Sequence, residues 1–178
     1  PSDAHNNDRN SPTSQPSTQA PGTYGLNTPG TASEYQYLRT WQNAMSLLEN
    51  RYLASRSGMA RRMILRAMGA AANMSGNRFV EFGVRSLAVA SGVDHTTVAA
   101  HLRALRSEQD ALITLVEPGR GVRGDLYLLS VPESVMAQAE KKRWRSGKLH
   151  ALRPAFRALG MPAAFVYEAL EHSPAPAS

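Results

Sequence analysis

Cysteine is missing from the 178-residue chain, and this absence excludes disulfides and thiolate metal sites. Long apolar runs are missing too. No stretch approaches the ~18 uninterrupted apolar residues of a membrane-spanning helix, and the polar start lacks the apolar segment of a secretory signal. Acidic residues are fewer than basic ones, 14 against 20, so the net charge is +6. A basic balance favours a polyanionic partner, either nucleic acid or an anionic membrane surface.

Motifs of common catalytic sites are absent as well. The sequence holds no HExxH, no GxSxG and no phosphate loop that ends in Lys-Ser or Lys-Thr. The five histidines are scattered, and His95 and His101 are six residues apart, which does not place them on one helix face. We therefore expect no catalytic site, no cofactor and no metal site in this chain.

The two ends of the chain differ in composition from the middle. Residues 1–32 are rich in Ser, Thr, Asn, Gln, Pro and Gly, and such a segment cannot bury enough apolar surface to offset its chain entropy. We predict disordered tails over residues 1–32 and 173–178, a domain over residues 33–131 and a basic helical segment over residues 132–172. Because the sequence begins with Pro1 and not Met, we also expect a processed product or a piece of a longer protein.

Helical periodicity is clear in the first part of the predicted domain. Residues 33–54 read as a helix with Ser33 as its N-cap, and a second helix is predicted over residues 58–74, ending at Ser75 to Asn77. The first helix has an apolar stripe that comprises Tyr37, Trp41, Ala44, Leu48 and Tyr52. The second has a stripe that comprises Ile64, Leu65, Met68, Ala71 and Ala72, with Arg61, Arg62 and Arg66 predicted to lie off it.

Short elements follow in the middle of the chain. We predict a strand over 79–84, a helix over 85–91, a turn over 92–94, a helix over 95–108, strands over 111–116 and 125–131, and a helix over 132–145 that opens at Pro132. Shorter helices are predicted over 149–159 and 163–171. Asp94 is predicted to cap the helix that begins at His95. The fold class is thus mainly α with a small β-hairpin.

The segment from Leu87 to Leu105 suits two short helices held at a fixed angle. Ala88 is small where the helices would meet, and Gly92 allows a sharp turn. Buried positions are predicted at Val93, Val98, Leu102 and Leu105. With the hairpin that follows, this pattern resembles the winged helix-turn-helix family of DNA-binding proteins, of the bacterial regulator or plasmid replication and partition type. The likeness covers residues 59–130 and implies a winged helix-turn-helix flanked by additional helices.

Such a fold would place the helix over residues 95–108 in the major groove of double-stranded DNA. The face opposite its apolar stripe offers small residues, hydroxyls and an arginine, which suit phosphate and base contacts. The candidate DNA-binding residues there are His95, Thr96, Thr97, Ala100, Arg103 and Ser107. Arg103 is the best candidate for a base contact.

Further arginines flank this helix. The tip of the hairpin, residues 119–124, carries Arg120 and Arg123, which suit a wing that contacts the backbone or minor groove. Arg85 begins the first helix of the motif and is a candidate phosphate contact. A second basic cluster contains Lys141, Lys142 and Arg145, which either contact phosphate or complement the dipole of a solvated helix end.

Each of these interpretations has a plainer alternative. His95 can begin a helix without any contact, Thr96 and Thr97 can be capping groups, and Arg103 can pair with Glu108 or Asp110. The hairpin tip can be a solvated turn. Winged helices also serve as protein–protein interaction modules, so the fold alone does not fix the function.

The residues leave the wider task open. We predict sequence-specific binding to double-stranded DNA, in replication or partition of a mobile element or in transcription control, by a cytoplasmic protein associated with the nucleoid. The alternative is a protein-interaction module in a larger assembly. A homodimer through helices 33–54 and 132–145 is also considered. Residues 58–68 and 160–170 share Gly, Met and Ala at matched positions, which suggests that 160–170 begins a second copy of the unit, truncated here.

Overall fold

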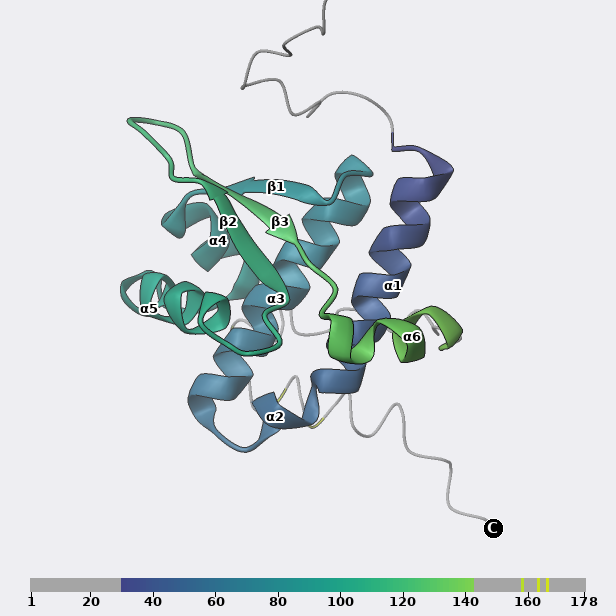
Figure 1. The fold of residues 1–178 in the computed structure, drawn as a ribbon. Helices are drawn as coiled ribbons and strands as arrows, with labels where there is room; N and C mark the ends of the chain where they lie inside the picture. Colours follow the sequence, from purple (N-terminus) through teal and green to yellow (C-terminus); the bar gives the residue numbers. More distant parts are fainter. Residues whose placement is uncertain (1–29, 143–157, 159–162, 164–165, 167–178) are drawn as a thin grey trace, which may run out of the picture.

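The computed structural model describes residues 30–142 and, beyond them, the single residues 158, 163 and 166. Within this part the chain is mainly helical, with one small antiparallel sheet (Figure 1). The elements are α1 (Ala32–Leu48), α2 (Asn50–Leu53), α3 (Arg56–Ser75), β1 (Phe79–Phe82), α4 (Val84–Ser91), α5 (His95–Arg106), β2 (Ile113–Glu117), β3 (Asp125–Leu129) and α6 (Glu133–Lys141). Among the described residues, no helix has the length and apolar character needed to cross a bilayer.

Several predictions fall outside the described residues. These are the polar tail up to residue 29, Arg145, nearly all of the helices predicted over 149–159 and 163–171, and the tail over 173–178. The proposed second copy of the unit at 160–170 falls outside them as well, apart from residues 163 and 166.

The predicted helix over residues 33–54 is two helices. The cap lies at Thr31 and not at Ser33, because the Thr31 hydroxyl accepts a hydrogen bond from the Glu34 N–H at 3.2 Å. The helix is interrupted at Glu49, after which α2 forms a single short turn. Glu49 itself keeps helical backbone angles, φ −62° and ψ −32°, and its carboxylate lies against two arginines of α3, Arg62 and Arg66.

Helix α3 runs through the centre of the domain, and its burial extends further round the helix than predicted. Met63, Ile64, Leu65 and Met68 are fully buried, as an apolar stripe requires. Arg62 and Arg66 were predicted to lie off this stripe, but they are buried too, at 5% and 8% exposure. A buried guanidinium needs a counter-charge, and Glu49 provides it.

The sheet has the strand order β1-β3-β2, and both pairings are antiparallel. The hairpin of β2 and β3 is the predicted one, whereas the pairing of β1 with β3 was not predicted. In register, Val80 faces Tyr127 and Thr114 faces Leu128. A β-bulge between Leu115 and Glu117 shifts the register where β2 leads into the loop.

The turn between α4 and α5 follows the prediction closely. Gly92 ends α4 with φ 71°, a left-handed conformation that glycine adopts without steric cost. Asp94 caps α5 by accepting a hydrogen bond from the Thr96 N–H at 2.8 Å. Val98, Leu102 and Leu105 are buried on the inner face of α5, which leaves its other face open to solvent.

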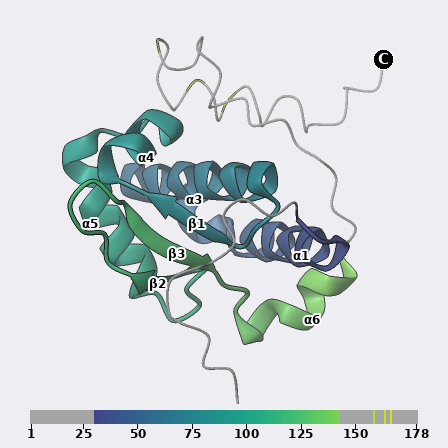
Figure 2. The same ribbon diagram turned by 90° about the horizontal axis from the view of Figure 1, so that it is seen from above.

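Helix α6 packs beside α1, on the side of the molecule away from α5 (Figure 2). It ends at Lys141, four residues before the predicted end, because the chain becomes extended at Lys142. The Asn43 side chain of α1 donates to the backbone oxygens of Ala139 and Lys142, each at 2.8 Å. Ala139 is fully buried in the same core as α1 and α3.

One hydrogen bond connects α1 to the start of the hairpin. The indole N–H of the fully buried Trp41 donates to the Leu112 oxygen at 2.8 Å. Helix α1 is therefore an integral part of the core and fixes the position from which β2 begins.

Candidate nucleic-acid interface

The solvent face of α5 presents the residues that the sequence predicted there. His95, Thr96, Thr97, Ala100, Arg103 and Ser107 are all exposed. Ala99 is exposed between them, so the middle of this face carries only methyl groups. A helix with such a face can approach another surface closely, because no long side chain holds it away.

Arg103 is exposed, and no ion pair or side-chain hydrogen bond of its guanidinium is found among the described residues. The alternative that it pairs with Glu108 or Asp110 is not what the structure shows. Glu108 lies 3.5 Å from Arg51 and 3.8 Å from Arg61, and Asp110 lies 3.9 Å from Arg51. Glu108 is thus paired with α2 and α3, and Asp110 with α2 and with Ser134 of α6, whose hydroxyl donates to it at 2.6 Å, which leaves Arg103 uncompensated.

The hydroxyls of this face are engaged within the chain, as the capping alternative predicted. Thr96 donates its hydroxyl hydrogen to the Asp94 carboxylate at 2.5 Å, and Thr97 donates to the Asp94 backbone oxygen at 2.9 Å. Ser107 donates to the Arg103 oxygen at 2.9 Å. A hydroxyl has a single hydrogen, so these three groups can still accept hydrogen bonds but cannot also donate to a phosphate.

Two titratable groups of α5 have shifted pKa values. The hydrogen bonds from the Thr96 hydroxyl and backbone N–H lower the pKa of the Asp94 carboxyl, so the exposed start of this face carries a negative charge at neutral pH. Burial, followed by the charge of Arg61, lowers the pKa of His101. His101 is half-buried and faces α3, so it is not part of the exposed face.

The loop between β2 and β3 is held by hydrogen bonds that three of its backbone N–H groups donate. The Arg123 N–H donates to the Arg120 oxygen at 3.2 Å, and the Gly119 N–H donates to the Asp125 carboxylate at 2.8 Å. At the base, the Gly124 N–H donates to Glu81 of β1 at 3.1 Å. These three bonds give the tip a defined shape, although its side chains are exposed.

The two arginines of this tip differ. Arg120 is exposed, and no ion pair of it is found in the part of the chain that the structure describes. Arg123 was also predicted to contact the DNA backbone or minor groove, and its exposed guanidinium lies 3.4 Å from Glu81. The antiparallel pairing of β1 with β3 brings Glu81 to the base of the loop, and this was not foreseen.

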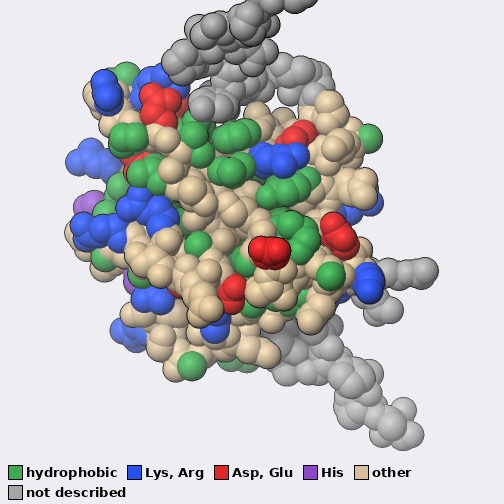
Figure 3. Space-filling model, in the orientation of Figure 1, with side chains coloured by type: hydrophobic (Ala, Val, Ile, Leu, Met, Phe, Trp, Pro, Cys, Tyr) green, Lys and Arg blue, Asp and Glu red, His purple; other side chains and the backbone are tan. Residues whose placement is uncertain are grey.

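Basic side chains gather on one side of the molecule. Figure 3 shows basic side chains over α5 and the β2–β3 loop, on the side away from α6, and all of them are arginines, because the described lysines lie at the end of α6. The exposed or half-buried arginines of these elements and of α4 are Arg85, Arg103, Arg106, Arg120 and Arg123. Glu108 and Asp110 are held away from this arginine face, which leaves Arg103 and Arg106 without an acidic partner, whereas Asp94 and Glu117 are exposed on α5 and β2.

The predicted C-terminal lysines are not part of this arginine face. Lys141 and Lys142 lie at the end of α6, beside α1, on the other side of the molecule (Figure 2). The Lys142 ammonium donates to the Ser46 hydroxyl at 2.7 Å, so this lysine holds α6 to α1. Arg145 lies outside the described residues.

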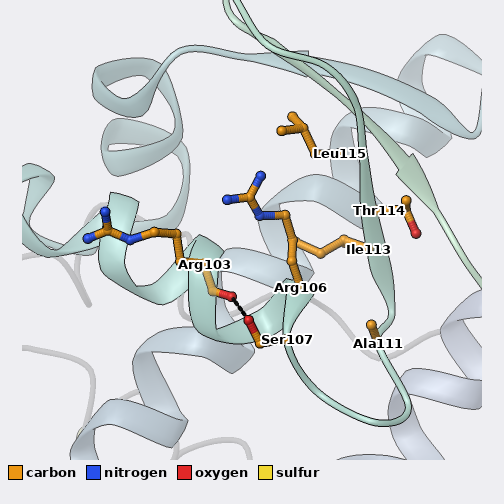
Figure 4. A pocket seen from close by; sticks show the side chains of 7 residues that line it. All are labelled: Arg103, Arg106, Ser107, Ala111, Ile113, Thr114 and Leu115. Carbon is orange, nitrogen blue, oxygen red and sulfur yellow. Dashed lines mark hydrogen bonds between the residues drawn. The ribbon is translucent and has the colours of Figure 1, made fainter.

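Arg106 belongs to the arginine face, but it was not among the predicted site residues. It lies on the C-terminal half of α5, one turn after Arg103, and it lines a groove against β2 (Figure 4). The sequence spacing indicates that Arg106 is a neighbour of Arg103, because residues three apart lie on adjacent parts of a helix surface.

The described residues contain no cluster of three or more His, Cys, Asp or Glu side chains that could hold a metal ion. What they do offer is a helix face with small side chains, flanked by uncompensated arginines. Comparison with protein-family models, with curated proteins and with solved structures gives no match.

Proposed function

We propose that this chain binds double-stranded DNA as a winged helix-turn-helix protein, with α5 in the major groove and the β2–β3 loop as the wing. The observation that carries the proposal is the arrangement of the arginine face. Its guanidiniums surround an exposed helix surface of small side chains, and the neighbouring carboxylates Glu108 and Asp110 are neutralised elsewhere. A surface of this kind matches a groove with phosphates along both edges.

The roles of the individual residues follow from their hydrogen-bonding state. Arg103 has all its donors available and can bind guanine O6 and N7 in a bidentate manner. Thr96 has used its hydrogen on Asp94, so it accepts hydrogen bonds from base amino groups. Arg85 and Arg120, which have exposed side chains, supply phosphate contacts on either side, and Arg120 also suits the minor groove.

The proposal is tested by measuring binding to a pool of random duplexes at several salt concentrations. Arg103→Gln and Arg120→Gln are expected to lower the affinity and flatten its salt dependence. Lys141→Gln and Arg39→Gln are matched controls, since they remove one positive charge each from exposed positions on α6 and α1. If all four variants bind duplex DNA equally well, the major-groove model is wrong.

Absence of duplex binding by the unmodified chain at moderate salt, together with stable association with a partner protein, would instead favour a protein-interaction module. Footprints on genomic fragments would show whether the sites lie at promoters or at replication origins. Palindromic sites with half-sites about one helical turn apart would support the predicted dimer.

A further inference from the structure

A groove of about 510 Å³ lies between the C-terminal half of α5 and the edge strand β2. Arg103 and Arg106 line it from the helix, and Ile113, Thr114 and Leu115 line it from the strand. Figure 4 shows the guanidinium of Arg106 extending toward Leu115, whereas that of Arg103 points outward, away from the strand. The groove thus has one arginine inside it and one at its outer border.

No acidic residue is among those that line the groove. Neither arginine has an ion pair within the described part of the chain, and Glu108, which follows closely in the sequence, is held by Arg51 and Arg61. Two uncompensated guanidiniums above an apolar floor of Ile113 and Leu115 suit a ligand that has both anionic and apolar parts.

The position of the groove points to one such ligand. Arg103 belongs both to the proposed reading face of α5 and to the border of the groove, so the two surfaces are continuous. A DNA strand that borders the major groove around α5 would pass directly into this space. Its phosphates match the guanidiniums, its deoxyribose rings match the apolar floor, and a volume of this size holds a group larger than a single ion.

We propose that the groove between α5 and β2 holds a segment of the sugar–phosphate backbone, and that Arg106 is the phosphate contact within it. This rests on the proposed function and adds a residue to it. Arg106 fixes the position of the duplex on the protein and does not read sequence, since phosphate contacts carry no direct sequence information. Arg103, at the border, keeps the reading role.

The test measures the affinities of Arg106→Gln, Arg103→Gln and the control Arg39→Gln for two duplexes. One is a duplex that the unmodified chain binds preferentially from the random pool, and the other has the same bases in scrambled order. Arg106→Gln is expected to weaken both complexes by a similar factor, on the order of tenfold. It should also reduce the slope of log affinity against log salt by about 0.9, the contribution of one phosphate contact. Arg103→Gln should weaken mainly the preferred complex, and Arg39→Gln should change neither. Arg106→Lys keeps the charge and should keep the slope.

A second measurement locates the phosphate. Duplexes that carry one uncharged methylphosphonate at successive positions are bound to the unmodified chain and to Arg106→Gln. The proposal expects one position at which the neutral linkage weakens binding by the unmodified chain but not by the variant. Circular dichroism confirms that each variant is folded. If Arg106→Gln is not folded, Arg106→Lys takes its place in this scan, with a reduced effect expected at the same position.

The outcomes separate the two proposals. If the unmodified chain binds duplex DNA with a steep salt dependence while Arg106→Gln behaves as Arg39→Gln does, the groove assignment is overturned and the DNA-binding proposal stands. If the unmodified chain shows no salt-dependent duplex binding, both are overturned. If a Glu-rich peptide binds in an Arg106-dependent manner and duplex DNA does not, the groove is a peptide site and the assignment to DNA is overturned.

Discussion

Glu81 is expected to restrain the proposed wing, and its neutralisation should therefore strengthen DNA binding. Its carboxylate lies 3.4 Å from the Arg123 guanidinium, whose side chain is 59% exposed. An exposed pair of this kind contributes about 0.2–1 kcal/mol. Releasing Arg123 to a phosphate should thus increase the affinity by at most about fivefold, because 1.4 kcal/mol corresponds to a factor of about ten. Glu81→Gln is the suitable change, since its amide oxygen can still accept the Gly124 N–H that Glu81 now accepts at 3.1 Å.

The assay is fluorescence anisotropy of a labelled duplex at fixed salt, with the unmodified chain, Glu81→Gln, Arg123→Gln and the double variant. The gain from Glu81→Gln should be largest when Arg123 is present and should shrink in the Arg123→Gln background. Glu81→Ala removes both interactions and controls for the shape of the loop. An equal gain in both backgrounds would show that only the overall charge matters, and a loss of affinity in Glu81→Gln would refute the reasoning.

Three further predictions concern stability. Trp41→Phe removes the indole hydrogen bond to the Leu112 oxygen, which keeps its bond from the Ser130 N–H at 2.9 Å, so the free energy of unfolding in urea should fall by about 0.5–1.5 kcal/mol; an unchanged free energy of unfolding would contradict this. Gly92→Ala should cost about 1–2 kcal/mol through the backbone alone, since φ is 71° and an added Cβ would meet no atom within 4 Å; a stability equal to that of the unmodified chain would count against the left-handed turn. Because the pKa of His101 is lowered in the fold, the unfolded chain binds a proton more readily, and the melting temperature should fall as pH drops below about 6.5. His101→Gln should flatten this dependence between about pH 7.5 and 5.5, and an unchanged dependence would point to another group.

Local features could be read from the sequence with good accuracy. The glycine at 92, the capping Asp94 and the stripe of Val98, Leu102 and Leu105 have the predicted structure, whereas the strand predicted over 79–84 ends at Phe82 because α4 begins at Val84. Each of these depends on residues that are only a few positions apart, so propensity and periodicity determine them.

Interactions between distant parts of the chain were not predictable in the same way. The burial of Arg62 depends on the carboxylate of Glu49, and the Arg123 partner Glu81 comes from a strand that only the sheet brings near. The groove that Arg106 lines is formed with β2, which only the tertiary fold places beside α5. Arg62 and Arg123 were expected on the surface from their own helix or loop, and in both cases a carboxylate from another element pairs with them in the fold.

The closed base of the β2–β3 loop has a practical consequence. A Cβ at Gly119 would lie 2.4 Å from the Arg123 oxygen, and one at Gly124 would lie 2.3 Å from the Phe82 backbone. Between these two crowded positions, Arg123 contacts Glu81 of β1 and Gly121 has φ 63°, whereas Arg120 and Val122 have exposed side chains. Residues 120 and 122 are therefore the positions of the loop at which a library of side chains can be introduced, and the library would be screened for altered duplex binding by the proposed wing.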